Sequence, residues 1–143
     1  MVGVTGTNGK TSIAFFVAAI GRLLEFEFGY IGTLGYGKIG NLVPSSLTTP
    51  DALDIQRMMR ELESLNVEGL SIEVSSHALA QKRVSHVNFD AAIFSNLSRD
   101  HLDYHEDMES YGATKKKLFT EWGLQSAIVN IDDDFGKRIV TDS

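Results

Sequence analysis

The sequence predicts an α/β domain with a mostly parallel sheet and helices on its faces. Short β-branched runs alternate with amphipathic stretches along the 143 residues, which is typical of consecutive βαβ units. Polar residues follow at once after three predicted strands, at 2–5, 69–75 and 91–95. Parallel strands end at one edge of a sheet, and ligands bind outside that edge in open α/β sheets. We therefore expect one shared site at the carboxyl ends of these strands.

The remaining elements follow from apolar spacing and turn residues. Residues 10–24 form a predicted helix whose apolar face consists of Ile13, Phe16, Val17, Ile20 and Leu24. Thr49 as N-cap and Pro50 at the first helical position predict a second helix, which ends near Asn66. A third helix is predicted over 108–122.

Glycines are concentrated between residues 29 and 41, where five of the 13 lie. This density predicts an irregular or hairpin-like segment. A last strand is predicted over residues 127–130. The chain opens directly on a short strand and a glycine turn, so we expect a piece of a longer chain; a small complete protein is the alternative.

The composition is that of one globular domain, residues 1–143, with 43% hydrophobic and 22% charged residues. The net charge of −6 argues against nucleic acid as a partner, because its phosphates require a basic face. The lack of cysteine excludes disulfides and thiolate metal sites, and it fits a reducing compartment. No run approaches the ~20 apolar residues of a membrane-spanning helix. We expect neither membrane insertion nor a signal peptide.

A phosphate-binding loop is the strongest local signal in the chain. The segment Gly6-Thr7-Asn8-Gly9-Lys10-Thr11-Ser12 follows a strand and opens a helix. Its glycines let backbone N–H groups approach phosphate oxygens, and the helix N-terminus adds partial positive charge. Lys10 can reach the β- and γ-phosphates, and the Thr11 hydroxyl can bind Mg²⁺. The loop is a shortened variant, since Val4 stands where the usual pattern has its first glycine. A tight strand–helix turn with an incidental lysine is the alternative.

Ionisable residues follow the later strands. Glu73, at the end of its strand, can hold a Mg²⁺ that bridges two phosphates; a solvated edge acid is the alternative. His77 is either a ligand or a cap of the following turn, and the second interpretation is favoured. A dense polar segment then contains Asp100, His101, Asp103 and His105. Beside a phosphate loop, this segment indicates a second metal or a substrate region, although its spacing matches no closed zinc site.

Three consecutive lysines, at positions 115–117, stand out in an acidic chain. A solvated helix face is the usual explanation of such a run. Because consecutive helical residues point about 100° apart, at most one of the three can face a site.

These motifs together resemble the Mur ligase family. The matching segments occur in the family's order and comprise residues 4–11, 48–49, 73–79, 96–105 and the pattern Tyr111-x-x-x-Lys115. The resemblance covers essentially the whole chain. It implies the P-loop-type, three-layer central domain of a Mur ligase, without the N-terminal domain that holds UDP and the C-terminal domain that recognises the amino acid.

The resemblance implies an ATP-dependent amide ligase of bacterial peptidoglycan synthesis, cytoplasmic and monomeric. Its substrates would be UDP-MurNAc-L-Ala-D-Glu and a third amino acid, either meso-diaminopimelate or L-lysine. ATP phosphorylates the carboxylate of the D-Glu end, the amine attacks the acyl-phosphate, and ADP and phosphate leave. The family selects the amino acid with its C-terminal domain. Because this sequence matches neither flanking domain, the chain alone is expected to bind MgATP at best weakly and not to ligate.

The family's site residues also map onto this sequence. The ATP phosphates would be bound by Gly6, Thr7, Asn8, Gly9, Lys10, Thr11 and Ser12. The first Mg²⁺ would be held by Thr11 and Glu73, and His101 would contribute to the second. The UDP-MurNAc-dipeptide would contact Thr48, Thr49, Ser75, Gln81 and Arg83. The catalytic set would be Lys10, Glu73, His101 and Lys115, of which Lys115 matches a lysine that is carbamylated in the family.

Other classes of protein fit the motifs less well. A folylpolyglutamate synthetase-like ligase shares the shortened loop, but the Ser75-Ser76-His77 run and the segment 100–105 argue against it. A GTPase-like switch would need an Asn/Thr-Lys-x-Asp pattern to read its base, and the sequence has none. A scaffold domain without phosphate chemistry would be favoured by loss of Lys10 or Glu73, and both are present.

Overall fold

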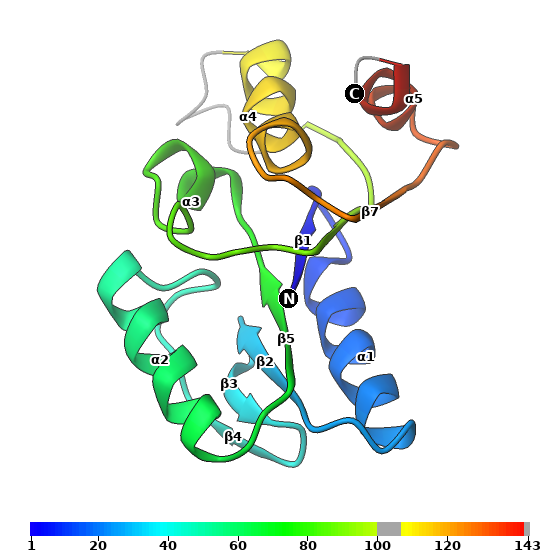
Figure 1. Ribbon diagram of the computed structural model, residues 1–143. Helices are drawn as coiled ribbons and strands as arrows, with labels where there is room; N and C mark the ends of the chain where they lie inside the picture. The colour runs from blue at the N-terminus through cyan, green and yellow to red at the C-terminus, as the bar shows by residue number, and fades with distance from the viewer. Residues whose placement is uncertain (100–106, 142–143) are drawn as a thin grey trace.

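The computed structural model describes residues 1–99 and 107–141, and these residues build a three-layer α/β fold (Figure 1). The elements are β1 (Val2–Thr5), α1 (Lys10–Leu23), β2 (Phe28–Gly32), β3 (Gly35–Lys38), β4 (Asn41–Val43), α2 (Ala52–Ser64), β5 (Gly69–Glu73), α3 (Ser76–Ala80), β6 (Ala91–Phe94), α4 (Met108–Thr120), β7 (Ser126–Val129) and α5 (Asp134–Thr141). The strands form one sheet in the order β4-β3-β2-β5-β1-β6-β7. The predicted fold class is confirmed.

The sheet is parallel from β2 to β7 and antiparallel at its β3–β4 edge. Val4 of β1 lies opposite Glu73 of β5 and Ile93 of β6, so these strands end at nearly the same level. The predicted hairpin is confirmed as the β2–β3 pair, in which Gly32 lies opposite Gly35. The carboxyl ends of β2, β5, β1 and β6 therefore meet at one edge of the sheet.

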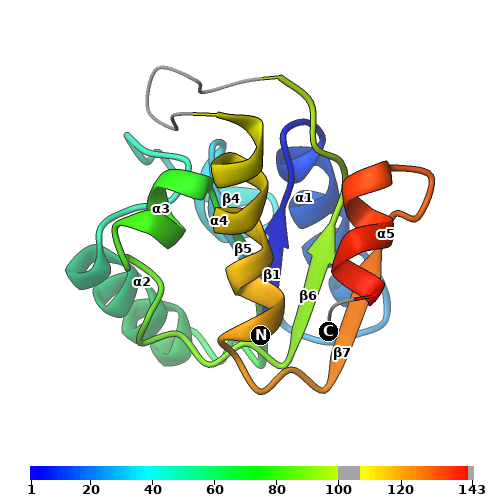
Figure 2. The ribbon, with the colours of Figure 1, turned by 90° about the horizontal axis from the view of Figure 1, so that it is seen from above.

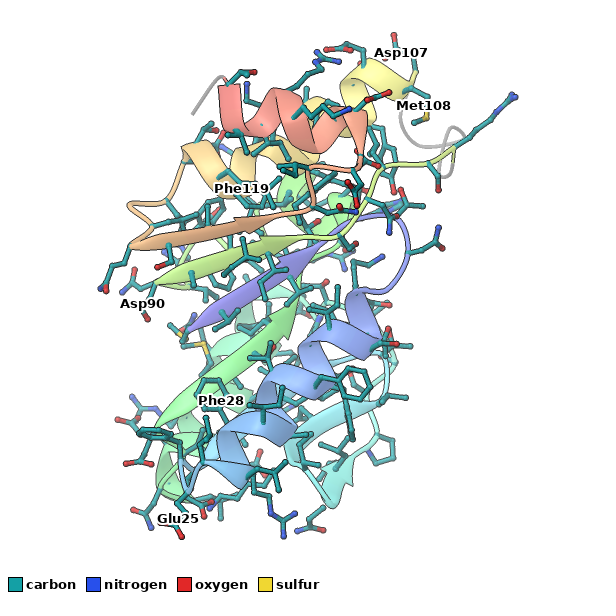
Figure 3. All side chains as sticks on the ribbon, turned by 90° about the vertical axis from the view of Figure 1, so that its right-hand side faces the viewer. Glu25, Phe28, Asp90, Asp107, Met108 and Phe119 are labelled. Atoms are coloured by element: carbon teal, nitrogen blue, oxygen red, sulfur yellow. The ribbon has the colours of Figure 1, made fainter. Side chains whose placement is uncertain are left out.

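Helix α1 covers one face of the sheet, and α2, α3, α4 and α5 cover the other (Figure 2). Two apolar clusters fill the space between these layers. The larger cluster joins the four helices to the sheet, and Phe119 of α4 belongs to it. The smaller one lies under α1, where Phe28 packs against it (Figure 3). No helix among the described residues is long and apolar enough to cross a membrane.

The predicted apolar face of α1 is wrong for most of its residues. The helix buries Ala14, Ala18 and Gly21, whereas Phe16 is 59% and Ile20 54% exposed. The reason is the close approach of α1 to the sheet: a Cβ at Gly21 would lie 2.8 Å from the ring of Phe28. Small side chains permit this approach. Of the predicted face, Ile13 is partly buried and packs against the smaller cluster, whereas Phe16 and Ile20 point away from the sheet.

The predicted start of α2 is also wrong. Asp51 is the N-cap, and its carboxylate accepts from the amide of Asp54 at 2.9 Å. Thr49 is unavailable as a cap because its hydroxyl donates to the backbone oxygen of Glu73 at 2.7 Å. Pro50 therefore precedes the helix, and Thr49 belongs to the edge where the strands end.

Two short helices were not predicted. In α3, Ser75 is the N-cap and accepts from the amide of Ala78 at 3.1 Å. His77 lies inside this helix. Helix α5 follows β7 and buries Phe135 and Ile139. The other predicted elements are present, with bounds that differ by one or two residues.

Candidate functional site

The loop between β1 and α1 depends on two glycines with positive φ. Gly6 has φ +145°, and a Cβ there would lie 1.9 Å from the Ser95 hydroxyl. Gly9 is the N-cap of α1, with φ 83° and ψ −4°. Residues with a side chain rarely adopt these conformations. The glycines therefore let the backbone turn sharply from the strand into the helix, as a phosphate-binding loop requires.

Residues after β6 fix the conformation of this loop. The Asn96 backbone oxygen accepts from the amide of Thr7 at 2.8 Å, and its side-chain oxygen accepts from the amide of Asn8 at 3.0 Å. The Ser95 hydroxyl donates to the Asn8 oxygen at 2.6 Å, and the Ser98 amide donates to the Thr7 hydroxyl at 3.0 Å. Sequence reasoning gave Ser95, Asn96 and Ser98 no individual role, although they stand at the end of a recognised strand.

Two lysines converge on the carbonyl oxygen of Gly6. Lys10 Nζ donates to it at 3.0 Å, and to the Thr7 oxygen at 2.9 Å. Lys115 Nζ donates to the Gly6 oxygen at 2.8 Å and lies 4.6 Å from the centre of the Tyr111 ring. Lys115 is buried and Lys117 is exposed, as the helical spacing predicts. Helix α4 thus brings one lysine of the run to the loop between β1 and α1.

The Glu73 carboxylate is fully buried, so its interpretation as a solvated edge acid is wrong. The Thr11 hydroxyl donates to Oε2 at 2.8 Å. Tyr30 Oη and the Thr33 amide donate to Oε1 at 2.5 and 2.9 Å. Glu73 forms no ion pair with any residue that the structure describes. A buried carboxylate with only neutral partners is suited to a cation.

Sequence reasoning missed Tyr30 and Thr33. Both belong to the segment that was expected to be irregular or hairpin-like, and this expectation gave no residue of the segment an individual role. Burial, and then the hydrogen bond to Glu73, raise the pKa of the Tyr30 phenol well above its ordinary value. The phenol therefore stays protonated near neutral pH and donates its hydrogen bond to Glu73.

Four of the five predicted dipeptide-contact residues lie together. The Thr49 hydroxyl accepts from the Ser75 amide at 3.0 Å, and the Thr49 backbone oxygen accepts from Arg83 Nη1 at 2.8 Å. Arg83 Nε also donates to Gln81 Oε1 at 2.8 Å. The fifth, Thr48, accepts from the Thr33 hydroxyl at 3.0 Å. Thr33, whose amide donates to Glu73, therefore connects Thr48 to this carboxylate.

The remaining predicted residues are either exposed or outside the described part of the chain. Asn8, Gly9 and Ser12 are exposed on the loop and the first turn of α1. His101 lies outside the described residues, together with Asp100, Asp103 and His105. Within 1–99 and 107–141, no three His, Cys, Asp or Glu side chains are placed to hold a metal ion. The candidate metal ligands in these ranges are thus one hydroxyl and one carboxylate.

The loop after β1, the buried strand-end carboxylate and the parallel sheet define a P-loop-type α/β domain. The chain belongs to the Mur ligase family, because the model of the Mur ligase middle domain matches residues 4–143.

Three similar proteins share one name. The chain is 49% identical over 140 residues to the UDP-N-acetylmuramoyl-L-alanyl-D-glutamate–2,6-diaminopimelate ligase of Coxiella burnetii, covering 98% of this chain and 29% of that protein. It is 51% identical over 142 residues to the ligase of the same name from Pseudomonas putida, covering 99% and 29%. A solved structure of a ligase of this name superposes with a TM-score of 0.91 at 37% identity, covering 98% of this chain and 28% of that one. The chain therefore spans less than a third of the length of these relatives.

Proposed function

We propose that residues 1–143 form the ATP-binding central domain of an ATP-dependent ligase that adds 2,6-diaminopimelate to UDP-MurNAc-L-Ala-D-Glu in bacterial peptidoglycan synthesis. The names of the relatives support the substrate and the added amino acid. The hydrogen bond between Thr11 Oγ1 and Glu73 Oε2, which joins the loop to the strand-end carboxylate, is the observation that carries the proposal. We place the protein in the cytoplasm as a monomer, because its nucleotide substrates occur there and the family acts in that form.

The residues fit a MgATP site. Mg²⁺ binds oxygen ligands, commonly one or two carboxylates together with substrate phosphates. Thr11 and Glu73 would hold the first Mg²⁺, and His101 would contribute to the second. Bound Mg²⁺ would offset negative charge on the γ-phosphoryl group during its transfer.

Residues 6–12 would bind the ATP phosphates through backbone N–H groups and the Lys10 ammonium. Lys10 Nζ contacts two loop carbonyl oxygens, at Gly6 and Thr7, and is only partly buried, so phosphate oxygens can replace these partners. Lys10 would then stabilise the charge that develops as the phosphoryl group moves to the acceptor carboxylate. Thr48, Thr49, Ser75, Gln81 and Arg83 would contact that acceptor, the UDP-MurNAc-dipeptide.

Lys115 is proposed as the carbamylated lysine. A buried ammonium beside two divalent cations would repel them, whereas a carbamate is an anion that can support a Mg²⁺ site. The position of Lys115 at the Gly6 carbonyl supports this assignment, since the modified side chain would remain beside the loop.

The test is a titration of MgATP into this chain, followed by calorimetry and by the amide NMR signals of the loop. We expect saturable, weak binding that Lys10→Ala abolishes. Lys117→Ala is the matched control, because it removes an exposed lysine and should leave binding unchanged. Without its flanking domains the chain should not ligate UDP-MurNAc-L-Ala-D-Glu. Equal MgATP affinity in the wild type and Lys10→Ala would contradict the proposed site.

A further inference from the structure

A network of hydroxyl groups from the β2–β3 hairpin holds the Glu73 carboxylate in one orientation. Oε1 accepts from Tyr30 Oη at 2.5 Å and from the Thr33 amide at 2.9 Å. Oε2 lies 2.8 Å from the Thr11 hydroxyl and 3.3 Å from the Thr33 hydroxyl. Both donors to Oε1 come from the hairpin, so this oxygen is occupied, whereas Oε2 is directed to the phosphate-binding loop.

The backbone of the β2–β3 hairpin allows Tyr30 to contact Glu73. Tyr30 lies opposite Ser71 in the sheet, so its phenol reaches diagonally along β5 to Glu73. Gly32 leaves the necessary space, because a Cβ there would lie 2.2 Å from Glu73 Oε1 and 2.4 Å from Tyr30 Oη. The amide of Leu34 donates to Tyr30 Oη at 3.3 Å, which directs the phenol proton to Glu73.

Thr33 extends the network to a second group of residues. Its hydroxyl lies 3.0 Å from Thr48 Oγ1 and 3.5 Å from Thr11 Oγ1. One side chain therefore lies between the phosphate-binding loop and the threonine pair that precedes α2. A shift of Thr33 would move both the carboxylate and Thr48.

We propose that Tyr30 and Thr33 are positioning residues, which fix Glu73 with Oε2 directed to the cation beside Thr11 and couple this orientation to Thr48. The inference rests on the Mg²⁺ site proposed above. Groups that hydrogen-bond to metal ligands commonly change metal affinity by about 10- to 100-fold when they are removed. Neither residue needs to touch the metal or ATP to have this effect.

The experiment compares the affinity of the chain for ATP with and without Mg²⁺ in Tyr30→Phe and Thr33→Val. We expect the affinity for Mg²⁺ in the ATP complex to fall about 10- to 100-fold, while ATP binding without Mg²⁺ stays unchanged. Thr33→Ser keeps the hydroxyl and should restore the wild-type value. Thermal unfolding of each variant verifies that the fold is retained.

Tyr36→Phe is the matched control, because Tyr36 in the same hairpin also donates to a glutamate, Glu61, at 3.1 Å. This variant should leave the Mg²⁺ dependence unchanged. If Tyr30→Phe and Thr33→Val both bind Mg²⁺ in the ATP complex as tightly as the wild type does, the role of Tyr30 and Thr33 is refuted, but the proposed metal site is not. ATP binding that does not respond to Mg²⁺ in the wild type would overturn the proposed metal site, and this inference with it.

Discussion

Replacing Gly6 with alanine should destabilise the chain by about 2–4 kcal/mol. The φ of +145° is unfavourable for alanine, and such a conformation costs about 1–3 kcal/mol. The new Cβ would also lie 1.9 Å from Ser95 Oγ, so this side chain must rotate and give up its 2.6 Å hydrogen bond to the Asn8 oxygen. Losing that bond adds about 0.5–1.5 kcal/mol.

Thermal unfolding followed by circular dichroism measures this effect. At about 4 °C per kcal/mol for a chain of this size, the Tm of Gly6→Ala should fall by about 8–16 °C. Gly9→Ala separates the two contributions, since its φ is +83° but its Cβ would meet only Ile13 Cδ1, at 3.8 Å. The cost at Gly9 should be about 1–2 kcal/mol. Gly123→Ala, with nothing within 4 Å, should change stability by less than about 0.5 kcal/mol. A Gly6→Ala variant no less stable than Gly9→Ala would refute the reasoning.

Two further predictions concern α4. Carbamylation of Lys115 predicts that carbon-13 bicarbonate gives a carbamate NMR signal. This signal should be absent from Lys115→Ala and retained in Lys117→Ala. A signal that Lys115→Ala leaves unaffected would contradict the assignment. The pKa of Asp107 lies below its ordinary value of 3.8 because the Ser110 amide donates to its carboxylate at 2.7 Å. A lowered carboxyl pKa stabilises the folded state above the ordinary pKa, and this contribution is lost as the pH falls through the lowered value. Amide exchange at the start of α4 should therefore speed up relative to Asp107→Asn as the pH falls below 3.8. Parallel rates in the two proteins would contradict this role.

The fold class and most elements could be predicted because their signals are local. Alternating β-branched runs and amphipathic stretches depend on side chains within one segment. The glycine pattern at residues 6–12, between a strand and a helix, likewise indicates a turn that exposes backbone amides. Glu73 could be chosen as a candidate site residue because it ends a strand whose neighbours also end in polar residues, and its role stays a prediction.

Other features required the packed structure. Apolar spacing in α1 predicted that large residues such as Phe16 and Ile20 form the buried face. The sheet approaches this helix so closely that the small residues Ala14, Ala18 and Gly21 are buried instead. Thr49 and Asp51 are both good N-caps by residue type. Asp51 caps α2 because Thr49 is hydrogen-bonded to β5, a strand more than 20 residues further along the chain.

The sequence by itself determined the α/β class and the glycine turn between β1 and α1, and it predicted the edge of the sheet where a site should lie. The tertiary structure decided how that edge is arranged. Tyr30 and Thr11 reach Glu73 across sequence separations of 43 and 62 residues, and the strand order β2-β5-β1 brings them together. Local periodicity reports which segments form strands and helices, whereas hydrogen bonds between distant side chains depend on which strands are neighbours. Partner residues such as Tyr30 and Thr33 therefore become visible only when the sheet is assembled.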